Sequence, residues 1–468
     1  MLKNTKIGEL YKKIKTYFEE IFNSESRRSF RIQRIIKGGL ATLASKGVFF
    51  LVTLISVPLT YNYLDEDHFG LLMTVMSFIG VLGFADLGLG FGLLNRIPDF
   101  ETQDNKEGIK KAISSTFYLL IIVGLFILVL ALFTKSYVDI KWMFNFKKDN
   151  LINDANSILT FFVLLFCIQL PFSIVAKIQI GFQESHINQV WEAISNVFSL
   201  VLTLIFIYLE LGVLFIFLAS FGVQTLFTIL NFIFSFYFKR RQLFPNIKYF
   251  DLSVFKLLMK DGILFFILQI FAIIVNTSDN LLISHQLGFD KVADYSVGYK
   301  LFNILVLPVA AFLGPTLPAY NDAFARKDYE WIQISVKKLL KLVSIISIGM
   351  GLFFYTFSEL IFKIWISESF AMQIDLIIAF SFLFIYFNFN QIFSLLFMSK
   401  ELIKYHFILY IIASTIALIL KIKFLNIFGS SGLLWAVNLS FFIFYFLPAY
   451  YIFNNKIEAK IKSNSTIA

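Results

Sequence analysis

The chain has 468 residues, of which 58% are hydrophobic and 15% are charged, and its formal net charge is +10. Soluble proteins carry roughly 25% charged residues, so this composition indicates a polytopic membrane protein without a large soluble domain. The positive charge is spread over segments that flank apolar runs, which argues against nucleic acid as a partner. Cys167 is the only cysteine, which excludes an intramolecular disulfide and a cysteine-rich metal site.

Residues 1–37 form a basic segment ahead of the first apolar run. Apolar side chains recur there at helical spacing, beside several lysines, at Ile7, Leu10, Tyr11, Ile14, Phe18 and Ile21. This pattern predicts an amphipathic helix that lies on a membrane surface, with a solvated tail as the alternative.

Long apolar runs fill the rest of the chain. A helix needs about 20 apolar residues to cross a bilayer, so the runs predict an all-α integral membrane protein with about twelve transmembrane helices. The predicted spans cover residues 38–62, 69–95, 112–134, 156–181, 187–209, 211–238, 262–284, 293–318, 334–357, 374–397, 404–424 and 432–453.

Lysine and arginine residues collect on one side of these spans. That side holds Arg27 and Arg28, the loop around Lys110, the segment from Lys239 to Lys248, and the C-terminal tail. Because cytoplasmic loops carry the excess of basic residues in multi-span proteins, both termini are expected in the cytoplasm.

The chain resembles itself when it is shifted by about 223 positions. This shift aligns Leu64-x-x-Asp67 with Leu287-x-x-Asp290. Six spans per half is an even number, so both halves enter from the same side, which predicts a parallel pseudo-two-fold repeat with cargo bound between the halves. The predicted units are a cytoplasmic N-terminal segment, a six-helix bundle, a cytoplasmic linker, a second six-helix bundle and a cytoplasmic tail, at residues 1–37, 38–238, 239–261, 262–453 and 454–468.

Two charged residues lie inside the first pair of spans. Counted from the basic ends Lys37 and Arg96, antiparallel helices would place Lys46 and Asp86 about 14 Å inside the same face, where they could meet. Polar residues follow the same face of the first span at Gly38, Thr42, Ser45, Thr53, Ser56 and Thr60. Ionisable groups at this depth are costly, so this face predicts either a packed interior or a water-filled cavity.

Further polar residues lie inside later spans. They are Gln269, Asn276 and Asp279 in the seventh span, Lys300 and Asn303 in the eighth, and Glu192 in the fifth. The repeat aligns the polar face of the seventh span with that of the first, which predicts one shared cavity. Glu192 lies deep in its span, which makes it the candidate proton site.

Two stretches resemble a known family. They are Phe84-Ala85-Asp86-Leu87-Gly88-Leu89-Gly90 with Gly92 and Asn95-Arg96, and Ser278-Asp279-Asn280-Leu281-Leu282-Ile283 with Leu287-Gly288 and Tyr295-Ser296-Val297-Gly298-Tyr299. Together with the span count and two-bundle arrangement of the whole chain, they resemble Wzx-type polysaccharide flippases of the multidrug, oligosaccharidyl-lipid and polysaccharide exporter (MOP) superfamily. The resemblance implies a bacterial inner-membrane carrier, not an enzyme and without a cofactor. Such a carrier moves undecaprenyl-diphosphate-linked oligosaccharide, an O-antigen or capsule repeat unit, to the outer leaflet by alternating access.

This resemblance suggests roles for the candidate residues. A diphosphate group needs cations in a low-dielectric cleft, and each half offers one, Lys46 or Lys300. The expected substrate-binding residues are Lys46, Lys300, Asn303, Gln269 and Asn276, and the expected ion-coupling or gating residues are Glu192, Asp86 and Asp279. We expect H⁺ or Na⁺ as the coupling ion and no metal site. The expected partners of this monomer are the lipid-linked oligosaccharide, the bilayer, a polysaccharide polymerase and chain-length proteins.

Each of these roles has a structural alternative. Lys46 could neutralise Asp86 between packed helices, Lys300 could extend to the membrane surface, and Asp279 could tie a helix end. Lys177 lies near the cytoplasmic end of its span, and we expect its side chain to extend to the surface.

Three other functions are compatible with the sequence. A cation-coupled multidrug exporter of the same superfamily would have a cavity dominated by carboxylates. A membrane glycosyltransferase or polymerase could use Asp65, Glu66 and Asp67, although the short external loops leave no substrate domain. A peptidoglycan-precursor flippase usually has about two further spans.

Overall fold

The computed structural model describes residues 27–81, 85–134, 144, 150–313, 320, 323–324, 326–397 and 402–465, and its regular elements in these ranges are helices. Helices are expected because backbone polar groups in lipid must be paired within the segment. The predicted amphipathic helix falls mainly on residues 1–26, outside the described residues.

The N-terminal bundle contains the helices of the first half. They are α2 Arg27–Tyr63, α3 Glu66–Val81, α4 Leu89–Thr102, α5 Lys106–Thr134, α7 Asn150–Phe172, α8 Ile174–Gly181, α9 Ser185–Tyr208, α10 Val213–Phe217 and α11 Val223–Phe234. Two π-helical turns, η2 Leu218–Gly222 and η3 Ser235–Lys239, lie on either side of α11. The short 3₁₀ turns η4 Arg241–Leu243 and η5 Ile247–Tyr249 lead to the second half.

The C-terminal bundle contains the remaining helices. They are α12 Leu252–Thr277, α13 Asp279–Gln286, α14 Phe289–Leu313, α16 Tyr329–Trp365, α17 Ile374–Phe397, α18 Ile403–Phe428, α19 Ser431–Phe441 and α20 Leu447–Ser465, with the π turn η6 Phe442–Phe446 between the last two.

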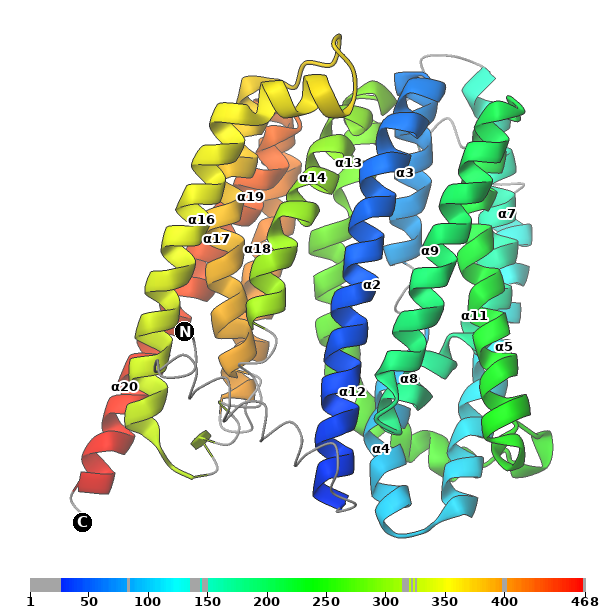
Figure 1. Ribbon diagram of the computed structural model, residues 1–468, viewed down its shortest axis with the longest axis vertical. Helices are drawn as coiled ribbons and strands as arrows, with labels where there is room; N and C mark the ends of the chain where they lie inside the picture. The colour runs from blue at the N-terminus through cyan, green and yellow to red at the C-terminus, as the bar shows by residue number, and fades with distance from the viewer. Residues whose placement is uncertain are drawn as a thin grey trace, which may run out of the picture.

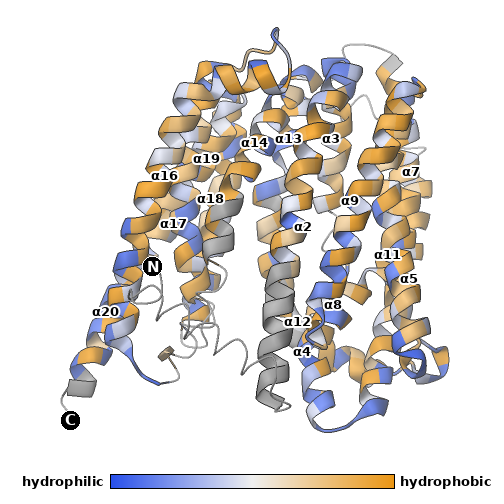
Figure 2. Cartoon of the chain, viewed as in Figure 1, coloured by the Kyte–Doolittle hydropathy of each residue, from blue (hydrophilic) through white to orange (hydrophobic). Residues whose placement is uncertain are grey.

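The described helices are long and apolar enough for a membrane protein. Nine helices in these ranges could span a bilayer by length and composition, or ten when the bent pair of residues 266–277 and 279–286 counts as one. Their outer surface is apolar (Figure 2), with Ile122 57% and Phe126 67% exposed. The all-α membrane fold is therefore confirmed, whereas the count of twelve spans stays a prediction.

The helix boundaries repeat along the chain. The first residues of α3 and α14 are Glu66 and Phe289, and those of α5 and α16 are Lys106 and Tyr329, so both pairs differ by 223 positions. The π turns η2 and η6 begin 224 positions apart. This agreement supports the predicted relation between the two halves.

The predicted second span is broken. The described part of α3 ends at Val81, a turn covers residues 85–88, and α4 starts at Leu89. Leu87 and Gly88 have φ angles of 53° and 76°, and a positive φ is easily adopted only by glycine. The turn brings Gly88 against α12, where a Cβ added to Gly262 would lie 2.2 Å from the Gly88 carbonyl oxygen.

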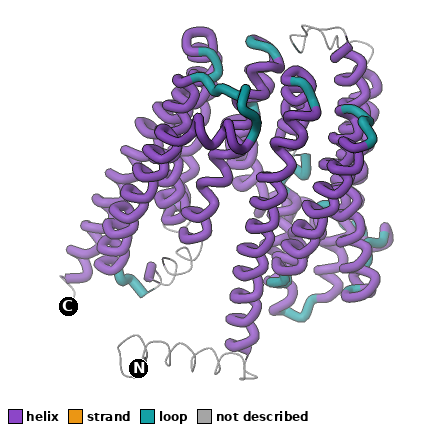
Figure 3. Tube along the Cα trace, turned by 45° about the horizontal axis from the view of Figure 1, so that its top comes forward, coloured by secondary structure: helices purple, strands orange, loops and turns teal. Residues whose placement is uncertain are grey.

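The two bundles lie side by side and meet at the end of the molecule that holds the turn between α2 and α3, which we call the hairpin end (Figures 1 and 3). There the Asn62 side chain donates a hydrogen bond to the Ile366 carbonyl (2.8 Å), and the Trp365 indole donates one to the Leu54 carbonyl (2.8 Å). Towards the opposite end, where the C-terminus lies, α16 and α20 diverge from α2.

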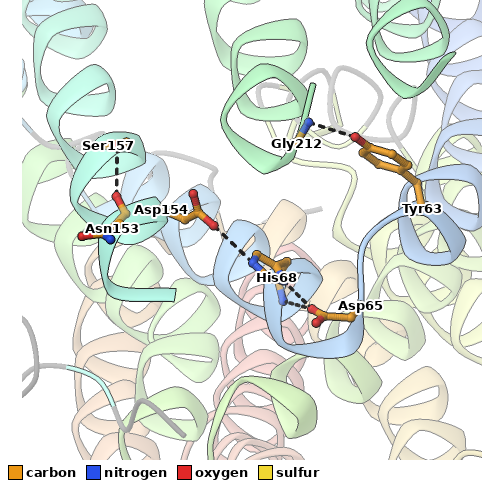
Figure 4. Close-up of polar contacts among 7 residues, drawn as sticks. All are labelled: Tyr63, Asp65, His68, Asn153, Asp154, Ser157 and Gly212. Atoms are coloured by element: carbon orange, nitrogen blue, oxygen red, sulfur yellow. Dashed lines mark hydrogen bonds and ion pairs between the residues drawn. The ribbon is translucent and has the colours of Figure 1, made fainter. Parts of the chain in front are cut away.

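Polar contacts also tie helices together within the N-terminal bundle at the hairpin end (Figure 4). The two ring nitrogens of His68 lie 2.5 Å from Asp65 and 3.2 Å from Asp154, which joins α3 to α7. The Tyr63 hydroxyl accepts a hydrogen bond from the Gly212 N–H at 2.8 Å, which joins α2 to the start of α10.

Candidate functional site

The N-terminal bundle contains a polar cavity of about 500 Å³. Its wall from α9 includes Asn188, Glu192, Ser195, Asn196 and Ser199, whose spacing of three and four residues places them on one helix face. Further polar side chains come from α7, from the residue between α7 and α8, and from the segment formed by η2 and α11, namely Gln169, Ser173, Ser220, Gln224, Thr228 and Asn231. The cavity therefore provides a polar lining inside an apolar bundle.

A buried hydrogen-bond network supports one wall of this cavity. The Gln179 side-chain nitrogen donates to Asn231 Oδ1 at 2.6 Å and to Ser235 Oγ at 2.8 Å. Asn231 Nδ2 in turn donates to Asn188 Oδ1 at 3.4 Å. Because buried amides are costly unless they are hydrogen-bonded, this network fixes the orientation of Asn231 and Asn188. Gln179, Asn231 and Ser235 were not predicted from the sequence.

Glu192 and its neighbours have unused hydrogen-bonding groups. Glu192 is exposed in the cavity lining and makes no ion pair or hydrogen bond with another described residue. Asn196 Nδ2 is buried and has no hydrogen-bond partner in the described part of the chain. The Trp191 ring packs against Phe227 and Phe234, with centroid distances of 6.1 and 5.8 Å. These groups are available to a ligand in the cavity.

A second cavity, of about 240 Å³, adjoins the first. Both cavities are lined by Gln169 and Ser173, and the second also contains Asp86, Lys177 and Gln269. Gln269, predicted to bind substrate, therefore lies beside Asp86, predicted to act in coupling or gating. Because Gln269 belongs to α12, this cavity lies where the two bundles adjoin.

Lys177 lies in this second cavity, and the predicted extension of its side chain to the surface is wrong. The helix is interrupted at Ser173, two residues after Pro171, and the short helix α8 that follows packs against α4. Lys177 is partly buried, and its Nζ lies 4.0 Å from the centroid of the Phe91 ring. It is the cation that interacts electrostatically with Asp86.

The predicted meeting of Lys46 with Asp86 is also wrong. Asp86 lies in the turn before α4, where its Oδ1 accepts a hydrogen bond from the Gly88 N–H at 3.0 Å. Counting helical rise back from Arg96 therefore gives a false position for Asp86, because the second span is not one helix. Lys46 is exposed on α2, and its Nζ lies 5.9 Å from the centroid of Phe49, a residue of the 500 Å³ cavity.

The polar face predicted for the first span divides into two environments. Ser45, Thr53 and Thr60 are buried, and α2 packs along α9. Ser56 is partly buried, and Lys46 is exposed. The buried part of this face therefore serves helix packing.

The candidate residues of α12 and α14 have exposed or partly exposed side chains. Asn276 is exposed and is hydrogen-bonded to Tyr410, and Asn303 is exposed and donates to the Tyr299 carbonyl at 3.0 Å. Lys300 is partly buried and has no ion pair or hydrogen bond with another described residue. Lys300 is therefore a desolvated cation without a partner in the described part of the chain.

Asp279 is held in a buried ion pair. Its Oδ1 lies 2.5 Å from Lys421 Nζ, and its Oδ2 accepts a hydrogen bond from the Tyr295 hydroxyl at 2.5 Å. Lys421 also donates to the Val275 carbonyl. These contacts secure the 42° bend between α12 and α13, as in the alternative role of tying a helix end. Lys421 was missed, although a lysine inside an apolar run is itself a signal.

The described residues contain no group of three or more His, Cys, Asp or Glu side chains that could hold a metal ion. The polar groups that line the two cavities are mainly amides and hydroxyls, with a carboxylate in each and Lys177 in the second. This arrangement can bind a polar ligand through hydrogen bonds and charge.

The sequence is similar to those of known proteins. A family model described as "Polysaccharide biosynthesis protein" matches residues 35–323. A relative from Shigella flexneri, described as an O-antigen transporter, is 22% identical over 343 residues, covering 72% of this chain and 78% of the relative. A second O-antigen transporter, from Salmonella typhimurium, is 25% identical over 193 residues, covering 40% of this chain and 44% of the relative.

Solved structures share the fold at low sequence identity. An inward-facing conformation of a multidrug resistance MATE family transporter of the MOP superfamily has a TM-score of 0.75 and 17% identity, covering 91% of this chain and 99% of that one. An outward-facing conformation of such a transporter has a TM-score of 0.66 and 18% identity, covering 92% and 96%. A MOP superfamily transporter from Pyrococcus furiosus, described as having a binding pocket of reverse polarity, has a TM-score of 0.63 and 15% identity, covering 94% and 98%.

These matches confirm the resemblance to Wzx-type flippases of the MOP superfamily. They indicate a multi-pass membrane transporter rather than an enzyme. The family model covers more than half of the sequence, and the chain belongs to the polysaccharide biosynthesis protein family, built on the fold of MOP superfamily transporters.

Proposed function

We propose that this protein moves an undecaprenyl-diphosphate-linked oligosaccharide, an O-antigen or capsule repeat unit, across the bacterial inner membrane by alternating access. The family match and the two O-antigen transporter relatives support the class of cargo. The observation that carries the proposal is Lys300, a partly buried cation without a described partner.

The chemistry of the cargo accounts for such a cation. A diphosphate that leaves the membrane surface loses its hydration, and an unpaired buried cation is equally unfavourable. Bringing the two together in a low-dielectric cleft removes both costs and forms charge-assisted hydrogen bonds. Lys300 therefore binds the diphosphate, with Lys46, Asn303, Gln269 and Asn276 as further substrate contacts.

The shape of the molecule supports alternating access. The bundles are hydrogen-bonded to each other at the hairpin end, and α16 and α20 diverge from α2 towards the opposite end (Figure 1), where α12 stays packed on α4. The TM-score is higher against the inward-facing transporter than against the outward-facing one, which fits a state open to the cytoplasm. Transport then requires the hairpin end to open, with Glu192 and Asp86 linking this change to H⁺ or Na⁺.

Substitution of Lys300 tests the proposal. In a host that lacks its own flippase, Lys300→Ala should lower surface glycan about tenfold or more, because a hydrogen bond to a charged group contributes about 1.5–3 kcal/mol. Lys300→Arg keeps the charge and should retain part of the activity. Lys423→Ala, which removes an exposed lysine of α18, is the matched control and should behave as wild type. Full activity of Lys300→Ala, at normal membrane levels, would contradict the cationic site.

A cation-coupled multidrug exporter is the second candidate function. Glu192 favours it, because this carboxylate lies in a cavity that also contains Phe49, Trp191 and Phe227. Aromatic rings and a carboxylate together bind cationic drugs. In a strain without drug efflux pumps, this function predicts ethidium resistance that is lost in Glu192→Gln, whereas glycan transport predicts no resistance.

A further inference from the structure

The 500 Å³ cavity of the N-terminal bundle is lined unlike a cleft for an anion. Its lining contains five amide side chains, five hydroxyl side chains and one charged residue, Glu192. No lysine or arginine lines it in the described part of the chain. The diphosphate of the proposed cargo therefore has no counter-ion here and belongs with the lysines outside this cavity.

The lining offers hydrogen-bond donors and acceptors in comparable numbers. The hydroxyls of Ser173, Ser220 and Thr228 donate to carbonyls of their own helices, which leaves their oxygen lone pairs facing outward as acceptors. Amide nitrogens supply donors, and Asn196 Nδ2 is a buried one without a partner among the described residues. A cationic drug uses acceptors only, so it would leave these donors unsatisfied. A polyhydroxyl compound both donates and accepts.

An aromatic ring stands beside these polar groups. Trp191 lines the cavity and is held by Phe227 and Phe234. A pyranose ring has apolar C–H faces and polar hydroxyl edges, so it packs on an indole face while its hydroxyls reach amides. The network of Gln179, Asn231 and Asn188 holds two of these amides in place before a ligand arrives.

We propose that this cavity is the glycan subsite of the carrier, where a sugar unit of the lipid-linked oligosaccharide packs on Trp191 and is hydrogen-bonded by Asn188, Asn196 and Gln224. The assignment rests on the proposed function and adds to it a second compartment. The sugar enters the cavity of the N-terminal bundle, and the diphosphate stays beside Lys300 and Lys46. The adjoining cavity shares Gln169 and Ser173 with the glycan subsite and extends from it to Gln269 of α12, in the other bundle.

Protection of an engineered thiol tests this subsite. Cys167, the only native cysteine, is replaced by serine, and Asn196→Cys is introduced, with Ser199→Cys as a second reporter in case the first fails to fold. Thr102→Cys, on an exposed residue at the end of α4, is the matched control. The proteins are reconstituted in liposomes and treated with a membrane-impermeant maleimide. The probes are lipid-linked oligosaccharide extracted from the source cells, undecaprenyl diphosphate without sugar, and ethidium.

The oligosaccharide should slow alkylation of Asn196→Cys and Ser199→Cys about tenfold when its concentration is about ten times the dissociation constant. Undecaprenyl diphosphate and ethidium should leave both rates unchanged, and no probe should affect Thr102→Cys. Trp191→Ala should raise the oligosaccharide concentration for half-protection by roughly threefold to tenfold, while Trp191→Phe should change it less.

Three results would overturn the glycan subsite. Equal protection by undecaprenyl diphosphate would place lipid or phosphate in the cavity, protection by ethidium alone would make it a cation site, and no protection by any probe would leave it without a ligand. Flipping of the oligosaccharide by the wild-type protein is measured in the same liposomes. Flipping without protection would contradict only the glycan subsite, whereas absence of flipping would contradict the proposed transport function itself.

Discussion

The ion pair between Asp279 and Lys421 is buried within the C-terminal bundle. The Lys421 side chain is 0% exposed and that of Asp279 is 8% exposed. Tyr295 and the Val275 carbonyl supply the remaining hydrogen bonds. A buried pair contributes little net stability compared with apolar residues, but loss of one member leaves an uncompensated charge. The pair therefore fixes how α18 meets the bend between α12 and α13.

A double-mutant cycle tests this role. Lys421→Met and Asp279→Asn should each destabilise the protein by about 3–5 kcal/mol, because each leaves its partner buried and unpaired. The double variant should be more stable than either single variant. Thermal unfolding in detergent measures all three, with Lys423→Met as the control on an exposed neighbour. Additive losses in the double variant would show that the two residues act independently.

Single residues show what the sequence can and cannot locate. The polar and charged character of Asp279, Glu192 and Gln269 inside apolar runs was visible, because such residues are costly in lipid. Their partners were not visible, since partners depend on how helices are rotated against each other. Lys421 stands two positions before Lys423 near the end of its run, and only the fold separates the buried lysine from the exposed one.

The crossing of α4 and α12 depends on glycine at both contact points. A Cβ on Gly262 would lie 2.2 Å from the Gly88 oxygen, and one on Gly92 would lie 2.3 Å from the Leu258 oxygen. Small residues at such crossings let helix backbones approach closely in membranes. The first part of α12, which falls inside the predicted linker of residues 239–261, is thereby packed against the N-terminal bundle.

Alanine at this crossing should push the helices apart. Gly262→Ala should lower stability by about 1–3 kcal/mol, the usual cost of overpacking, and should reduce transport as well. Gly349→Ala is the matched control, because a Cβ at Gly349 meets nothing within 4 Å. It should be neutral or slightly stabilising. The melting temperature and the amount of each variant in the membrane measure these effects. Wild-type stability of the Gly262→Ala variant would rule out the tight crossing.

At the level of elements, the lengths of the apolar runs predicted where helices occur, because lipid leaves few other choices. The breaks inside the second, fourth and seventh predicted spans were missed. Gly88 and Gly92 let α4 pack closely on α12, and the turn at Leu87 between α3 and α4 lies at this contact. Pro171 marks the break between α7 and α8, and its sequence signal was present and unused.

Two side-chain hydrogen bonds among the described residues join α2 to the end of α16 and the residue after it at the hairpin end. Trp365 of α16 donates to the Leu54 carbonyl of α2, and Asn62 donates to the Ile366 carbonyl. In an alternating-access cycle these bonds must break when that end opens. They therefore stabilise the state in which the hairpin end is closed.

Trp365→Phe should shift the population towards the state that is open at the hairpin end. One hydrogen bond contributes about 0.5–1.5 kcal/mol, so the ratio of the two states should change roughly twofold to tenfold. Spin labels at Thr102 and Glu330, in a Cys167→Ser background, should report shorter distances at the opposite end. Trp331→Phe is the control. An unchanged distance distribution in Trp365→Phe would show that this hydrogen bond does not affect the ratio of the two states.

The organisation of the whole molecule was predicted more completely than its site. The repeat in the sequence agrees with helix starts that recur after 223 positions. The placement of the bundles relative to each other depends on contacts such as that of Trp365 with Leu54, which are far apart in sequence and weak individually. Glu192 indicated one wall of the cavity, but the other walls, which include Gln169 of α7 and Gln224 of α11, depend on how these helices pack against α9.

The π turn η2 sets the direction of every side chain that follows it in the sixth span. A π turn holds one residue more than an α turn, and each residue of an α-helix advances the side-chain direction by about 100°. Deletion of Ala219 would restore a continuous α-helix and swing Gln224 and Asn231 out of the cavity by about that angle. The polar lining of this cavity thus depends on one inserted residue. The π turn η6 begins 224 positions later and shifts the side-chain directions of the last span in the same way.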